Sequence, residues 1–431
     1  MSFRALLALA LLVLAVSAER CGFYAIRTFL TYDFTRAGLT SRETVNVLRA
    51  LSFVGYVAPF AGGGLAYKLG PRATAIVGAS IAALGAFAMA AGASPTTMCF
   101  VVAFGAGIFR PTPIAAAAEI LMREDGGPTF APSPRNLAAV ATFTSISYAA
   151  INLGSMIAPI AAGILRDTRD GSGAGGTVYA FAGAMDVLAV ALAGGALFLG
   201  SDAAKTAAQQ AHAPYRMPDP TQDAAAADAN APTRPPEAVF GPLVLIGGLY
   251  ACMFLVMDRI TPNSIELGLA RSSWLFSINP VVILLMAIPC AVLYLVLAVQ
   301  RSAMALTKII GAGALVFAFG GLLGMAALLT HAGLALWIPA LGAMAIGEAI
   351  MLPLGFAYAA LALRSRASTL VVAGWSSLTA APAFMIGFSM NEARGSLFGS
   401  ALAVLAVIAI GIGGVLVLMK AERLHQDLVP R

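Results

Sequence analysis

The chain has 431 residues, of which 60% are hydrophobic and 11% are charged, and its mean hydropathy is +0.87. This composition excludes an ordinary soluble domain and predicts an integral membrane protein that is solvated by the lipid bilayer. The net charge of +6 comes from loops rather than from a basic face interleaved with aromatic residues, so we expect no binding to nucleic acid.

Apolar stretches long enough to cross ~30 Å of hydrocarbon follow one another along the chain. They cover about residues 3–31, 45–69, 73–93, 96–122, 137–165, 177–199, 239–268, 272–299, 305–330, 333–363, 367–391 and 395–420. Between the sixth and seventh stretches, residues 201–238 are rich in Ala, Pro, Asp, Gln and Thr and lack a sustained apolar face. This composition is typical of a flexible linker. The sequence predicts an all-α membrane protein with twelve transmembrane helices in two six-helix bundles, 1–200 and 239–424, followed by a tail at 425–431.

Basic residues gather in alternate loops between these stretches. The loops on one side contain Lys68, Arg72, Arg123, Arg135, Lys205, Arg216, Arg234, Arg301, Lys308, Arg364, Arg366, Lys420 and Arg423. The positive-inside rule then predicts that both termini and the linker are cytoplasmic. Residues 1–18 resemble a signal peptide, but the apolar stretch continues to Leu30, so we expect an uncleaved first span. Residues 428–431 match what thrombin leaves on cutting its site, so we expect them to have no functional role.

Enzyme signatures are nearly absent from the sequence. There is no HExxH, GxSxG or Walker sequence, and the GxGxxG of residues 171–176 lies in a loop with no strand before it. The cysteines lie in or near apolar stretches without metal-ligand spacing, which favours a role as small core side chains: Cys21, Cys99, Cys252 and Cys290. We therefore expect no enzymatic activity, no metal site and no cofactor.

Four ionisable residues lie inside apolar stretches, where such residues are usually functional: Arg27, Arg110, Asp258 and Glu348. The two cations fall in the first and fourth spans, and the two anions fall in the equivalent seventh and tenth spans. Helix rise places Arg27 and Asp258 in the outer half of the membrane and the other two at or below its midplane. This pattern predicts a charged central cavity in a two-lobed transporter. Permanent ion pairs that set helix register are the alternative.

Polar stripes accompany these charges on two helices. On the first span, Arg20, Tyr24 and Arg27 follow i, i+4, i+7 spacing, and Glu19 precedes them, so we expect this face to line the cavity. On the fifth span, Tyr148, Asn152 and Ser155 repeat that spacing, although helix-packing hydrogen bonds would explain them as well. Asp186, on the sixth span, has less sequence context, and a structural role is open for it.

Several of these segments resemble signatures of the proton-dependent oligopeptide transporters, a branch of the major facilitator superfamily. Residues 19–25 (ERCGFYA), followed by Arg27, resemble its E-x-x-E-R-F-x-Y-Y-G motif. Residues 107–111 (GIFRP) are similar to its G-x-F-K-P segment, and 148–155 (YAAINLGS) to its F-Y-x-x-I-N-x-G-S signature. Counterparts also occur in the second half of the chain: Asp258, residues 277–280 (SINP), Gly347 and Glu348 with Pro353, and Gly374 with Trp375.

The resemblance implies a major facilitator superfamily fold that works as a monomer and carries di- and tripeptides, or similar amphoteric solutes, by alternating access. The inward proton gradient would drive this symport across a bacterial inner (plasma) membrane. By position, Arg27 and Arg110 would attract the substrate carboxylate and Glu348 its amino terminus. The pocket would be shaped by Tyr24, Tyr148, Asn152, Asn279 and Trp375. Gating and proton coupling would fall to Glu19, Arg20, Arg27, Arg110, Asp258 and Glu348, with Arg27–Asp258 as the outer pair and Arg110–Glu348 as the inner pair.

The sequence also departs from the family pattern. Val16 stands in place of the first Glu of the motif, so one carboxylate linked to proton coupling is missing. Arg110 replaces a Lys and stays charged at any working pH. Tyr67 stands where the superfamily loop after the second span normally carries an Asp. A carrier for another anionic or amphoteric metabolite, a drug/proton antiporter and a non-transporting receptor are therefore alternative functions.

Overall fold

The structure of the chain is a computed structural model that describes residues 2–124, 134–167, 174–210, 243–253, 255–256, 275–299, 303–330, 334–361, 369–377 and 397–421. The regular secondary structure in these ranges is all α-helical. Ten helical spans within them are long and apolar enough to cross a membrane, and Leu243–Met253 is a shorter apolar helix. The chain is thus an all-α integral membrane protein. The predicted spans at 239–268 and 367–391 lie partly outside the described residues.

The first half of the chain forms one group of helices, which we call the N-terminal group. It comprises α1 (Phe3–Arg36), α2 (Ser41–Val57), α3 (Pro59–Leu69), α4 (Pro71–Ala90), α5 (Pro95–Phe109), α6 (Thr112–Glu124), α7 (Pro134–Asp167) and α8 (Ala174–Gln210). Two predicted spans are each divided into two helices, α2 with α3 and α5 with α6. Pro59 and Pro111 stand at the divisions, because proline has no N–H to donate to the preceding turn.

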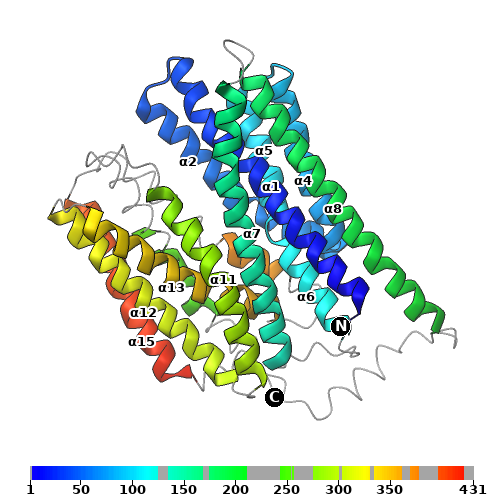
Figure 1. Cartoon of the computed structure of the whole chain (residues 1–431), viewed down its shortest axis with the longest axis vertical. Helices are drawn as coiled ribbons and strands as arrows, with labels where there is room; N and C mark the ends of the chain where they lie inside the picture. The colour runs from blue at the N-terminus through cyan, green and yellow to red at the C-terminus, as the bar shows by residue number, and fades with distance from the viewer. Residues whose placement is uncertain are drawn as a thin grey trace.

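The second half forms the C-terminal group, which contains Leu243–Met253, α11 (Leu275–Val299), α12 (Ala303–Leu329), α13 (Leu334–Leu361), residues 369–377 and α15 (Leu397–Met419). In Figure 1 the two groups stand side by side, with α7 and α11 adjacent at the centre. Helix α7 also packs against α13. Helix α8 continues to Gln210, so the first residues of the predicted linker, 201–210, are helical, while 211–242 lie outside the described residues.

Equivalent helix pairs in the two groups pack through glycine. In the N-terminal group, a Cβ added to Gly78 of α4 would lie 2.9 Å from the carbonyl oxygen of Gly105 on α5. In the C-terminal group, a Cβ on Gly347 of α13 would lie 2.6 Å from the carbonyl oxygen of Gly313 on α12. Small residues let membrane helices approach closely enough for van der Waals packing. These contacts fix α5 and α13 just before the residues that carry charge, Arg110 and Glu348.

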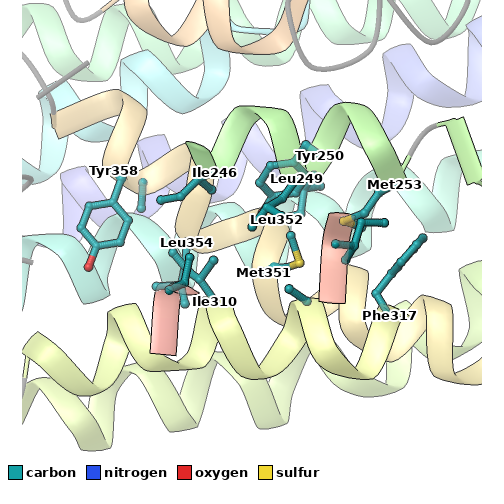
Figure 2. Packing of buried hydrophobic residues seen from close by; sticks show 14 of the residues in the cluster. Ile246, Leu249, Tyr250, Met253, Ile310, Phe317, Met351, Leu352, Leu354 and Tyr358 are labelled. Atoms are coloured by element: carbon teal, nitrogen blue, oxygen red, sulfur yellow. The ribbon is translucent and has the colours of Figure 1, made fainter. Parts of the chain in front are cut away.

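The largest buried cluster lies mainly in the C-terminal group. Figure 2 shows the helix of residues 243–253 packed against α12 and α13. The labelled side chains include Ile246, Leu249, Tyr250 and Met253 from the first helix, Ile310 and Phe317 from α12, and Met351, Leu352, Leu354 and Tyr358 from α13. The Thr307 and Tyr358 hydroxyls lie 2.8 Å apart and hydrogen-bond each other within this packing. The cluster holds α13, and therefore Glu348, in a rigid setting.

Candidate functional site

A cavity of ≈ 320 Å³ lies between the two helical groups. Helices α1, α2, α5, α6 and α7 line it from the N-terminal group, and α11, α13 and residues 369–377 line it from the other. Most residues that the sequence analysis singles out meet there: Glu19, Arg20, Tyr24, Arg27, Arg110, Tyr148, Asn152, Asn279 and Glu348. The cavity is therefore the candidate functional site.

Glu348 is a carboxylate that the C-terminal group contributes to the cavity, and its side chain is only 5% exposed. One carboxylate oxygen accepts a hydrogen bond from the Tyr148 hydroxyl on α7. The other accepts a bond of 2.9 Å from the Asn279 amide on α11. The bond from Tyr148 joins the two helical groups inside the cavity. Because an ionised carboxylate has about four acceptor positions, Glu348 retains capacity for further donors.

Arg110 stands where α5 ends and α6 has not yet begun. Its backbone N–H still donates to the carbonyl of Ala106, and Pro111 then interrupts the helix. The guanidinium carbon lies 3.9 Å from the centroid of the Tyr56 ring on α2, an arrangement that a planar cation favours. Within the described residues Arg110 makes no ion pair with Glu348. The expected inner pair is thus not formed in this conformation.

Glu19 and Arg20 form a bidentate ion pair on α1. The Arg20 Nε and Nη2 atoms lie 2.5 and 2.6 Å from the two oxygens of Glu19. Arg20 Nη2 also donates to the carbonyl of Ala106 on α5 at 3.4 Å. The side chains are 0% and 4% exposed, so each charge depends on the other for compensation. Two turns further along α1, the guanidinium carbon of Arg27 lies 6.0 Å from the Tyr24 ring centroid, and both residues line the cavity.

The polar residues Tyr148, Asn152 and Ser155 on α7 do not all face the cavity. Tyr148 and Asn152 line the cavity. The Asn152 amide donates to the carbonyl of Tyr148 at 2.8 Å, and the Ser155 hydroxyl donates to the carbonyl of Asn152 at 2.9 Å. Ser155 is not among the lining residues. Its hydrogen bond stays within α7, so it supports neither a place in the cavity lining nor a packing bond to another helix.

Two further residues of the expected site have different outcomes. Asp258 is outside the described residues, so its pairing with Arg27 stays a prediction. Trp375 is 6% exposed and meets the Tyr250 ring edge-on at 5.5 Å, and it is not among the residues that line the cavity. Its neighbour Ser376 lines the cavity instead. Val16 also lines the cavity, so an apolar side chain stands where the family motif has a carboxylate.

Tyr56 is the main residue that sequence reasoning missed. It lies on α2 without a neighbouring charge or motif, and only the approach of α2 to the break at Arg110 brings it into the cavity. Thr144 and Ser147 of α7 were missed as well. Thr144 lies one turn before Tyr148, and Ser147 is adjacent to it in sequence. The 3.6-residue period around Tyr148 would therefore have pointed to this face of α7.

Between the cavity and the start of α7, the two helical groups are packed together. We call this region the floor. The Thr142 and Ser145 hydroxyls of α7 donate to the carbonyls of Ala291 and Ala287 on α11, at 3.5 and 3.4 Å. On α3, a Cβ added to Gly63 would lie 2.5 Å from the Cβ of Ala373. The floor therefore closes the interface by direct backbone approach.

No family model matches the chain, and no curated protein sequence does. Solved structures match nearly all of it. A crystal structure of a POT family transporter in complex with a thioalcohol-conjugated peptide gives a TM-score of 0.62 at 16% identity, with 96% of each chain covered. A crystal structure of the peptide transporter POT in complex with sulfate gives 0.61 at 17% identity, covering 98% of this chain and 96% of the other. A bacterial homologue of the human drug peptide transporters gives 0.54 at 15% identity, with 98% of both chains covered.

These structures are of transporters rather than enzymes, and each match extends across both helical groups. At such low identities the likeness establishes the fold and nothing finer. It confirms, at that level, the resemblance drawn from the residues of α1, α5 and α7. The chain is therefore an integral membrane protein with the major facilitator superfamily fold that the POT transporters share.

Proposed function

We propose that this chain is a secondary active transporter that carries di- and tripeptides, or similar amphoteric solutes, together with protons. One observation carries the proposal: guanidinium groups of the N-terminal group and a carboxylate of the C-terminal group line the same cavity. The residues are Arg27 and Arg110 on one side and Glu348 on the other. A zwitterion would satisfy both sides at once.

The contacts of each charge suit this role. The substrate carboxylate can accept two parallel hydrogen bonds from the guanidinium of Arg110, which stacking on Tyr56 holds in one plane. The substrate ammonium can donate to Glu348, which already accepts two bonds and has acceptor positions left. Such bonds replace the hydration that a charged solute loses in the cavity.

The size of the cavity is also suitable. Its volume of ≈ 320 Å³ lies at the lower end of the range of about 300–1,000 Å³ typical of small-ligand sites. This favours short peptides and solutes of similar size. The apolar part of the lining, which includes Ile114, Ile151 and Leu352, can accommodate side chains without specific recognition.

Alternating access would use the contacts between the two groups. The substrate ammonium competes with the Tyr148 hydroxyl for Glu348, so binding exchanges a bond that joins the groups. Protonation of Glu348 would remove the charge that holds the ammonium, which links proton binding to release. Glu19 is a second candidate for binding the coupled proton. Asp258 with Arg27 would form the outer gate. We place both termini and the floor in the cytoplasm of a bacterial cell, with the protein acting as a monomer in the plasma membrane.

A carrier for another anionic or amphoteric metabolite is the second candidate function. Among the described lining residues, the guanidinium groups of Arg20, Arg27 and Arg110 outnumber the carboxylates of Glu19 and Glu348. A net positive lining attracts anions and disfavours cationic drugs. Thermal stabilisation across a panel of solutes would separate the two candidates, because a peptide carrier would respond to dipeptides and not to small organic anions.

Uptake of labelled di- and tripeptides into proteoliposomes tests the proposal. We expect an inward proton gradient to accelerate uptake and a proton-collapsing ionophore to abolish the acceleration. Liposomes without protein provide the background. If folded, correctly inserted protein takes up no peptide under either condition, the peptide assignment is wrong and the panel of anionic and amphoteric solutes decides the substrate.

A further inference from the structure

Asp186 on α8 is a buried carboxylate that the proposed transport site does not use. Its side chain is 0% exposed, and neither carboxylate oxygen has a hydrogen-bond partner among the described residues. It is not among the residues that line the cavity. A buried polar group without partners is unusual in a folded protein and calls for an explanation.

The carboxylate of Asp186 lies against α1. A Cβ added to Gly22 would lie 3.1 Å from Asp186 Oδ1 and 2.8 Å from the carbonyl oxygen of Ala182. Only the absence of a side chain at position 22 allows α8 to approach this closely. The contact places Asp186 beside the α1 segment that contains the Glu19–Arg20 pair.

Among the described residues, the charged neighbours of Asp186 come from α1 alone. Glu19 and Arg20 act on it electrostatically, and the Cys21 thiol is also close enough to sense its charge. The other helices packed against α8 are α4 and α7. They carry charged residues only near their ends: Arg72 on α4, and Arg135, Arg166 and Asp167 on α7.

The charge balance of this cluster favours a bound proton. Arg20 already compensates Glu19 with two short bonds. An ionised Asp186 would add a second carboxylate to one guanidinium, and no donor from the described part of the chain would replace its lost hydration. Such a group is stable when buried only in its neutral form.

We propose that Asp186 is a proton-binding residue of the transporter. It holds one proton while the Glu19–Arg20 pair is intact, and it yields that proton when Arg20 turns from Glu19 toward Asp186. In that step the O–H bond of Asp186 breaks and an O–H bond forms on Glu19, so the charge of Arg20 then compensates the ionised Asp186. Glu19 lines the cavity and can then release the proton to water there. This inference depends on the proposed function for its role in transport, but not for the proton itself.

The position of Asp186 also bears on the missing acid of α1. Val16, which lines the cavity at the place of the first motif Glu, lies one turn before Glu19 on the same helix. Asp186 brings a carboxylate to this cluster from α8 instead. The proton-coupling group would thus have been supplied by a different helix.

Infrared spectroscopy of the purified full-length protein in lipid tests proton binding without any substrate. We expect wild type at neutral pH to show the carbonyl stretch of a neutral carboxylic acid, shifted in deuterium oxide, and Asp186→Asn to lose it. Asp33→Asn is the matched control, because Asp33 accepts a 2.7 Å bond from the Tyr179 hydroxyl and has a donor to hold its charge. The Asp33 variant should keep the band. A band of equal size in wild type and Asp186→Asn would overturn the proposal.

Isotope labelling keeps the test decisive if Asp186→Asn fails to fold. Carbon-13 in the aspartate side-chain carboxyl groups of wild type should shift the band, and an unshifted band would assign it to glutamate and exclude Asp186. In proteoliposomes, Asp186→Asn should lose acceleration of peptide uptake by a proton gradient but keep exchange of labelled for unlabelled peptide. Unchanged acceleration would remove Asp186 from coupling. Absence of peptide uptake by wild type would contradict the proposed substrate and leave the infrared result to decide on the proton.

Discussion

The two buried carboxylates Glu348 and Asp186 occupy contrasting environments. Glu348 lies between the helical groups and accepts bonds from Tyr148 of one group and Asn279 of the other. Asp186 lies inside the N-terminal group, against Gly22, and has no hydrogen-bond partner among the described residues. The first is held by donors that a substrate could replace, whereas the second is isolated from the cavity.

This contrast separates two tasks that a coupled transporter must perform. A group that binds substrate must exchange partners at the interface that opens and closes. A group that stores a proton benefits from a low-dielectric place that changes little during that motion, because its protonation then responds to neighbouring charge. The following variants test this division.

The largest effect is expected for Glu348→Gln. The substitution keeps the shape of the side chain and removes the charge that faces the substrate ammonium, so dipeptide binding should weaken by about 2–5 kcal/mol and uptake should be lost. Glu43→Gln is the control, because Glu43 is exposed in the capping box of α2 and Gln preserves that cap. Uptake in proteoliposomes is the measurement. Normal uptake by Glu348→Gln would remove this residue from the mechanism.

Arg110→Ala should weaken binding of an anionic substrate by about 1.5–3 kcal/mol, the value of a hydrogen bond to a charged group. Arg110→Lys should recover only part of the loss, because an ammonium does not stack on Tyr56 or bind a carboxylate in bidentate fashion. Ligand-dependent thermal shifts measure both. Equal affinity of the Lys and Arg proteins would argue against bidentate recognition.

Gly63→Val should open the floor, because its Cβ would lie 2.5 Å from the Cβ of Ala373. Overpacking of this kind costs about 1–3 kcal/mol, and we expect the conformation with a closed floor to become less populated. Gly64→Val is the control, since a Cβ there meets nothing within 4 Å. Labelling of a Thr142→Cys probe from the side of the floor should accelerate only in the Gly63 variant. No difference between the two glycines would contradict direct closure.

Gly22→Ala tests the region around Asp186. The new methyl group would lie 2.8 Å from the Ala182 carbonyl oxygen, so α1 and α8 must separate. We expect a loss of about 1–3 kcal/mol in stability, measured by thermal unfolding. Gly163→Ala, where a Cβ meets nothing within 4 Å, should be close to neutral. If the Gly22→Ala and Gly163→Ala variants are equally stable, the packing of α8 on α1 does not depend on close approach at Gly22.

Tyr148→Phe should have the smallest effect. It removes one hydroxyl bond to Glu348 but leaves the bond from Asn279, so we expect about 0.5–1.5 kcal/mol in dipeptide affinity. Tyr179→Phe removes a comparable bond, to Asp33, within the N-terminal group. That control should leave affinity unchanged in equilibrium binding measurements. A similar change in both variants would show that the location of the bond between the groups is unimportant.

Much of the fold could be read from local patterns. The apolar stretches predicted the spans, because a helix in lipid must be apolar over its full length. The spacing of Arg20, Tyr24 and Arg27 predicted one face of α1, and all three residues line the cavity. Helical periodicity is a property of neighbouring residues, so it is visible without the rest of the chain.

Which residues meet across the cavity could not be predicted in this way. The sequence suggested Arg110 opposite Glu348, yet Arg110 stacks on Tyr56 and Glu348 is bonded by Tyr148 and Asn279. The approach of α2 brings Tyr56 to Arg110, and the two groups meet at a floor set by glycine and hydroxyl contacts. Both effects depend on distances between helices.

Local sequence thus accounts for the membrane-spanning character, the position of the charges along each helix and the faces that carry them. These properties depend on composition and on the 3.6-residue period alone. The folded arrangement of the helices sets the partner of each charge, and it places Asp186 behind Gly22 without a hydrogen-bond partner among the described residues. Partners are decided there because a hydrogen bond or an ion pair requires two atoms within about 3 Å, and only the packing of whole helices sets distances on that scale.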